Sequence, residues 1–108
     1  MTEQEDHALS MQVAHDGAVT RIVPVGEIDM SSANTFETVA GQVLLAHPDR
    51  IELDLAGVEF IDSSGLSSII QLRTRAERDS IELCITGLSP AAERVLELTG
   101  LIAELRKS

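Results

Sequence analysis

Apolar and polar residues alternate at the beginning of the chain in the manner of a β-hairpin. Residues 9–13 alternate strictly, and Asp16-Gly17 is a dipeptide that tight hairpin turns prefer. The returning segment, residues 18–25, becomes increasingly apolar, which is typical of a strand covered on both faces. Because Pro24 has no amide hydrogen, we expect this strand to have a free side at that position.

The rest of the chain alternates between helical and extended patterns. Apolar residues recur at helical spacing from Ala33 until Pro48 stops the helix, and we expect the hydroxyls of Ser31 and Ser32 to cap it. The other expected elements are a strand over 51–55, a helix from the cluster 62–65 to Arg78, a strand over 81–85, a helix from Pro90 to Gly100 and a short last helix over 101–105. This order predicts an α/β fold, a single domain with a mixed sheet of four to five strands, an N-terminal hairpin and helices packed on the sheet.

Composition and charge limit what such a domain does. The chain has 108 residues, enough for one core, and its net charge of −10 disfavours binding to nucleic acid or to an anionic membrane. No apolar run approaches the roughly 20 residues that span a bilayer, and residues 1–6 are acidic where a signal peptide is basic. We therefore expect a cytoplasmic protein with a flexible acidic tail at residues 1–6 and one domain over residues 7–108.

Residues with catalytic potential are sparse. Cys84 is the single cysteine and lies in an apolar segment, so we expect it to be a thiol packed in the core. The histidines are scattered, and the sequence lacks glycine-rich phosphate-binding loops and the zinc-binding His-Glu-x-x-His motif. The sequence therefore predicts no enzymatic activity, no cofactor and no metal site.

The most informative motif is Asp62-Ser63-Ser64-Gly65, where a strand is expected to end and a helix to begin. One interpretation is a helix cap, because serine and aspartate oxygens accept the free amide hydrogens of a first helical turn. The other is a phosphorylation site at Ser63, because the same amides and the positive end of the helix dipole stabilise a phosphate. These residues alone leave the two interpretations balanced.

A second acidic group, Gly26-Glu27-Ile28-Asp29, follows the preceding predicted strand. Because parallel strands with helical crossovers end at one edge of a sheet, we expect Asp29 to lie near Asp62 and Ser63. Two carboxylates near a serine hydroxyl are compatible with Mg²⁺ binding or with acid–base catalysis. The alternative is that both are solvated loop residues.

Taken together, these residues resemble the STAS domains, and among them the bacterial anti-sigma factor antagonists. The resemblance covers nearly the whole chain, although isoleucine stands at position 28, where leucine is common in the family. The segments that carry it are residues 26–29, 51–55, 60–66, 87–90 and 99–101.

The resemblance implies a regulatory switch. In that family an anti-sigma factor that is itself an ATP-dependent kinase phosphorylates the serine after the loop aspartate, which is Ser63 here. The unphosphorylated antagonist binds the anti-sigma factor and so frees the sigma factor for transcription; the phosphorylated form dissociates, and a phosphatase resets it. Asp29, Asp62, Ser64 and Gly65 are then expected to form the partner-binding surface.

The family also contains proteins with another role. Some STAS subunits regulate lipid-transport ABC complexes through the same face without phosphorylation, and they often lack a phosphorylatable serine in the loop. Because Ser63 and Ser64 are both present in a free-standing chain, the sequence favours the anti-sigma factor antagonist over this alternative.

Overall fold

The chain forms five strands and three helices within the part that the computed structural model describes, residues 9–99. In chain order these are β1 (Ser10–Asp16), β2 (Val19–Ile28), α1 (Ala33–Leu45), β3 (Arg50–Leu55), β4 (Val58–Ile61), α2 (Ser63–Arg78), β5 (Glu82–Leu88) and α3 (Pro90–Thr99). The hairpin, the three helices, β3 and β5 lie close to where the sequence predicts them. Only β4 was not expected.

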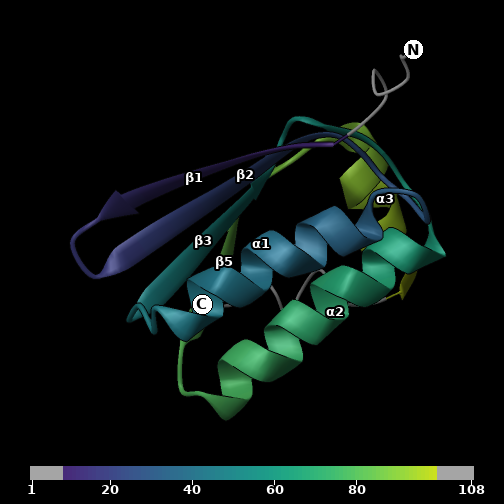
Figure 1. The fold of residues 1–108 in the computed structure, drawn as a ribbon. Helices are drawn as coiled ribbons and strands as arrows, with labels where there is room; N and C mark the ends of the chain where they lie inside the picture. Colours follow the sequence, from purple (N-terminus) through teal and green to yellow (C-terminus); the bar gives the residue numbers. More distant parts are fainter. Residues whose placement is uncertain (1–8, 100–108) are drawn as a thin grey trace.

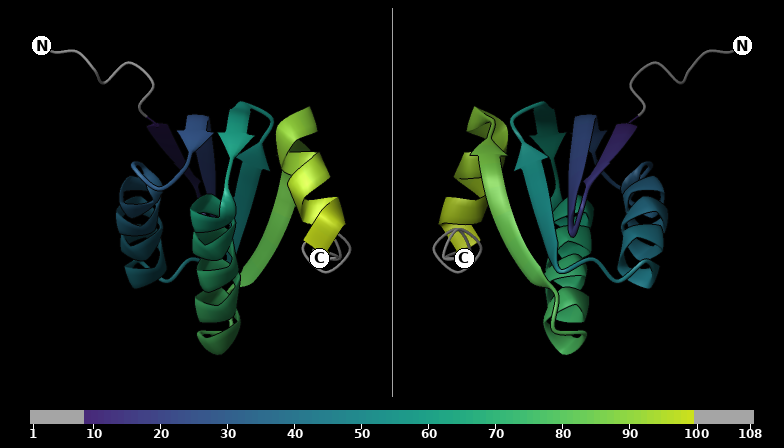
Figure 2. Two further views of the ribbon diagram at one scale, coloured as in Figure 1. Left: turned by 90° about the vertical axis from the view of Figure 1, so that its right-hand side faces the viewer. Right: turned by 90° about the vertical axis from the view of Figure 1, so that its left-hand side faces the viewer.

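The strands form one mixed sheet. Its order is β1-β2-β3-β5, and β4 pairs with β2 off this path. β1 runs antiparallel to β2, whereas the other pairs are parallel. The helices α1 and α2 lie side by side on one face of the sheet, and α3 packs against β4 and β5 (Figures 1 and 2). The predicted α/β class and mixed sheet are therefore confirmed.

The unexpected strand, β4, explains how β2 accommodates its proline. The pairing of β2 with β3 ends at Ile22, and its pairing with β4 begins at Gly26. Pro24 therefore lies between the two partners, so its missing amide hydrogen removes no bond from either parallel ladder. The expected free side at this residue is confirmed, and it marks the point where β2 changes partner.

The core lies between the sheet and its helices, and the helices that the structure describes cover only one face of the sheet. Along β3 every second residue is buried, and Phe36 and Ile69, from α1 and α2, are fully buried against that face. The expectation that β2 is covered on both faces is wrong, since Arg21 is exposed. Cys84 is only half-buried rather than packed in the core, because its neighbours Leu83 and Ile85 take the inward positions of β5.

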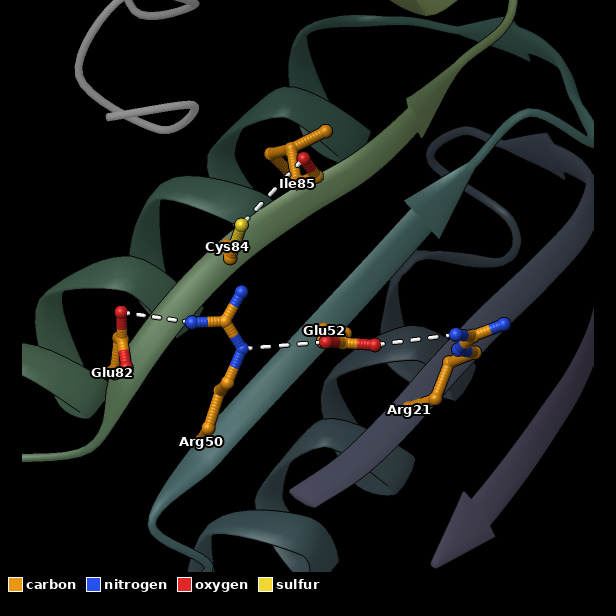
Figure 3. Close-up of polar contacts among 6 residues, drawn as sticks. All are labelled: Arg21, Arg50, Glu52, Glu82, Cys84 and Ile85. Atoms are coloured by element: carbon orange, nitrogen blue, oxygen red, sulfur yellow. Dashed lines mark hydrogen bonds and ion pairs between the residues drawn. The ribbon is translucent and has the colours of Figure 1, made fainter. Parts of the chain in front are cut away.

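An ion-pair ladder crosses the open face of the sheet (Figure 3). Glu52 on β3 contacts Arg21 on β2 and Arg50 on its own strand, each at 3.3 Å, and Arg50 reaches Glu82 on β5 at 2.9 Å. The hydrogen bond to Glu82 is the main reason that the pKa of Arg50 lies above its usual value. Alternating charges thus join three parallel strands on the face that no described helix covers.

Two expectations fall outside the described residues: the flexible tail at 1–6 and the short helix over 101–105. The boundaries of the domain at residues 7 and 108 therefore stay predictions. Between residues 9 and 99, none of the helices is long and apolar enough to cross a membrane.

We predict that Glu52→Gln lowers the urea midpoint of unfolding by more than Glu77→Gln does. Glu52 is 21% exposed and contacts two arginines, whereas Glu77 is 73% exposed and, among the described residues, pairs with Arg73 at 3.7 Å. Exposed pairs contribute little to stability, and networks contribute more. The difference between the urea midpoints of the two variants should become smaller in about 1 M salt, where charges are screened. Equal midpoints for the two variants would contradict a stabilising ladder.

Candidate functional site

Two connections meet at the edge of the sheet where β2 and β4 end. Residues 29–32 lead from β2 to α1, and Asp62 leads from β4 directly into α2. Because the strands are parallel, with Ile28 opposite Ile61, both connections leave the sheet at the same edge (Figure 1). The prediction that Asp29 and Asp62 lie at one edge is therefore confirmed.

Asp62 caps helix α2 and holds the neighbouring loop. Its Oδ1 accepts hydrogen bonds from the amides of Ser64 and Gly65 at 2.9 and 3.0 Å. Its Oδ2 accepts the amide hydrogen of Met30 at 3.2 Å. The cap interpretation of the motif is confirmed, and one carboxylate joins two segments that lie 32 residues apart.

Asp29 organises the connection to α1. Its Oδ1 accepts hydrogen bonds from the hydroxyl and amide of Ser31, at 2.7 and 3.0 Å, and from the amide of Ser32 at 3.2 Å. The hydrogen bond from the Ser31 hydroxyl is the main reason that the pKa of Asp29 lies below its usual value of 3.8. Desolvation opposes this shift, and the other hydrogen bonds from Ser31 and Ser32 add to it. The loop is thus built around an ionised carboxylate.

The expected capping by serine hydroxyls at α1 is wrong. Ser32 occupies the N-cap position, but its side chain caps no helical amide. Its hydroxyl donates instead to the carbonyl of Glu27 at 2.6 Å, and the hydroxyl of Ser31 donates to Asp29. The carbonyl of Asp29 accepts the amide hydrogen of Ala33 at 2.7 Å. Aspartate therefore takes the role that we assigned to the serines.

The residues after Asp62 differ in exposure. Ser63 is the first residue of α2 and is exposed, Ser64 is half-buried and Gly65 is buried. A Cβ atom on Gly65 would collide with the carbonyl oxygen of Ile28 and lie only 2.9 Å from Cγ1 of Ile61. The absence of a side chain at Gly65 lets α2 start against the ends of β2 and β4, and Ser63 then faces solvent.

A hydrogen bond between the helices beneath this turn was missed by the sequence analysis. Ser68 is 1% exposed, and its hydroxyl donates to Oε2 of Glu37 on α1 at 2.6 Å; it also lies 3.2 Å from the carbonyl oxygen of Ser64. The available signal is that Ser68 directly precedes the apolar Ile69 on the buried face of α2. This contact joins α1 to the first turns of α2.

The chemistry of the site is therefore limited to one exposed hydroxyl beside engaged carboxylates. The oxygens of Asp62 and Oδ1 of Asp29 accept backbone and hydroxyl hydrogens of the loops. Over residues 9–99 the fold assembles no group of three or more His, Cys, Asp or Glu side chains that is suited to a metal ion. The hydroxyl of Ser63 is exposed at the beginning of a helix, where a partner can reach it.

We predict that Gly65→Ala destabilises the protein by about 3 kcal/mol, because the added methyl group meets the backbone of Ile28. Gly41→Ala is the matched control, since its nearest neighbour would be Nη1 of Arg75 at 3.9 Å. That change should stabilise α1 by up to about 1 kcal/mol. Urea unfolding measures both variants, and a Gly65→Ala protein as stable as the wild type would contradict the close approach.

We also predict an acid-dependent stability contribution from Asp29. Its pKa is lower in the folded chain than the usual value of 3.8, so its contribution is complete above that value and is lost as the pH falls towards the folded pKa. Asp29→Asn should therefore cost stability at about pH 6 and less at about pH 3. Urea midpoints at the two pH values test this, and a constant difference would contradict it.

Comparisons with known proteins agree with this geometry. A model of the STAS domain family matches residues 10–107. The anti-sigma-F factor antagonist RsfB of Mycobacterium tuberculosis is 28% identical over 94 residues, which are 87% of this chain and 76% of that protein. The crystal structure of an anti-sigma factor antagonist from Mycobacterium paratuberculosis matches with a TM-score of 0.83 and 27% identity, covering 93% of this chain and 85% of that one.

A more distant structure shows the same fold. SpoIIAA, the Bacillus cell fate determinant, in its phosphorylated form, has a TM-score of 0.69 and 18% identity, with 85% of each chain covered. The agreement of the family match, the mixed sheet and the loop from β4 into α2 leads to one conclusion. This chain belongs to the STAS domain family.

Proposed function

We propose that this chain is an anti-sigma factor antagonist that is switched by phosphorylation of Ser63. In its unphosphorylated form it binds an anti-sigma factor with serine kinase activity and thereby frees a sigma factor for transcription. Transfer of phosphate from ATP to Ser63 releases it, and a phosphatase restores the hydroxyl. The names and similarity of the mycobacterial relatives support the antagonist role.

The observation that carries the proposal is the exposure of Ser63 at the first position of α2. A helix N-terminus stabilises negative charge, so a phosphate there is electrostatically favoured within the chain. Asp62 already caps the amides of Ser64 and Gly65, which keeps the turn in place whether or not Ser63 is modified. In this proposal Asp29, Asp62, Ser64 and Gly65 hold the shape of the partner-binding surface.

Release requires only a modest change in the free energy of binding between the chain and the anti-sigma factor. A phosphoserine adds roughly −1.5 to −2 charges at neutral pH. If lost contacts and repulsion together weaken binding by about 3 kcal/mol, the affinity falls roughly a hundredfold. The charge and the hydration of a phosphate placed in the interface are a sufficient source for that change.

The test is phosphate transfer to purified chain from each serine-kinase anti-sigma factor of the source genome, with ATP and Mg²⁺. We expect one phosphoryl group, located on Ser63 by peptide mass spectrometry. Ser63→Ala should remain unmodified and still bind the kinase, because the alanine leaves the cap at Asp62 unchanged. Ser67→Ala is the matched control, since Ser67 is also exposed on α2, and it should be modified like the wild type.

The opposite pattern would reject the proposal. Phosphate that appears on Ser63→Ala, or wild-type chain that neither binds nor is modified by any of these kinases, contradicts it. Binding to a permease or ATPase of a lipid-transport complex instead would support the alternative STAS role.

A further inference from the structure

The two carboxylates of the site are largely occupied by its own loops. Oδ1 of Asp62 holds the first turn of α2 and Oδ2 holds the amide of Met30, while Oδ1 of Asp29 holds Ser31 and Ser32. A partner that approaches Ser63 therefore meets other side chains first.

Two large apolar side chains are exposed beside Ser63. Met30 is 81% exposed, and Phe60 is 49% exposed. The amide of Met30 is bonded to Asp62, the residue before Ser63, and Phe60 lies two residues before Asp62 on β4. Phe60 is paired in register with Glu27 of β2, so both apolar residues belong to the edge where the two connections meet.

The exposure of Phe60 contrasts with the burial of Phe36, the other phenylalanine of the chain, which is fully buried in the core. Burial of an aromatic side chain is strongly favourable, and aromatic residues and methionine are enriched in the centres of protein interfaces. Met30 is also adaptable, because its side chain is unbranched and polarizable. Both residues are thus suited to contact with a protein surface.

The charges near Met30 and Phe60 limit which kind of partner surface can bind there. Residues 22–49 and 51–72 contain no lysine or arginine, whereas Glu27, Asp29 and Asp62 lie at this edge. An acidic partner surface is therefore repelled. An apolar surface free of acidic side chains is compatible with both Met30 and Phe60 and with the negative field around them.

We propose that Met30 and Phe60 are the principal contact residues for the anti-sigma factor, and that they insert into an apolar recess of its surface. This inference rests on the function proposed above and specifies the chemistry of the partner. It also explains release, because a phosphate on Ser63 has to lose water when it meets an apolar surface of the partner.

The experiment measures the affinity of unphosphorylated variants for the anti-sigma kinase that modifies the wild-type chain, by titration calorimetry with ADP present. We expect Met30→Ala and Phe60→Ala each to weaken binding at least tenfold, and Met30→Leu to keep the affinity within about threefold, since it retains an apolar side chain of similar size. Leu45→Ala is the matched control, because Leu45 is 84% exposed at the far end of α1, and it should bind like the wild type.

Circular dichroism and urea unfolding show whether a variant binds weakly because it has lost a contact or because it no longer folds. Both alanine variants should unfold near the wild-type midpoint, because their side chains are exposed. Alanine variants that fold and bind within twofold of the wild type overturn this inference and leave the switch at Ser63 intact. Wild-type chain that binds no anti-sigma kinase overturns both.

Discussion

The close contact between the first turn of α2 and the end of β2 is the constraint on which the rest of the site depends. Gly65 lies against the carbonyl of Ile28 and the side chain of Ile61, where any Cβ atom would collide. Because α2 starts this close to the sheet, the carboxylate of Asp62 reaches both the helix amides and the amide of Met30. A larger residue at position 65 would move the helix and separate the two loops.

In this arrangement, one set of groups holds the shape of the loops and another set is exposed to a partner. Backbone amides and the carboxylates of Asp29 and Asp62 hold the loops, and the hydrogen bond from the buried Ser68 to Glu37 joins α1 to α2 beneath them. The exposed groups of this edge include the hydroxyl of Ser63 and the apolar side chains of Met30 and Phe60. A site of this composition is suited to a protein partner, and a charge added at its centre changes the interface more than it changes the fold.

The two faces of the sheet differ in chemistry within the part of the chain that the structure describes. Its covered face is apolar and packs on α1 and α2, while arginines and glutamates of β2, β3 and β5 pair across the other face. Cys84 lies on this second face beside those charges (Figure 3). On β5 the outward positions of a segment that is apolar in sequence are thus taken by Glu82, Cys84 and Thr86.

Periodicity and turn residues predicted the hairpin, the three helices, β3 and β5, because these signals act over short distances along the chain. The sequence also identified residues 62–65 as a candidate helix cap and placed Asp29 at the same edge, since parallel strands end together. β4 escaped prediction because Val58 and Ile61 face the core with two exposed residues between them, so the segment does not alternate. Only the tertiary structure decided that Asp29 rather than Ser32 organises the start of α1, that Cys84 faces outward, and that Met30 and Phe60 remain exposed beside Ser63. These outcomes depend on which distant backbone atoms and side chains lie nearby, and local sequence carries no record of that.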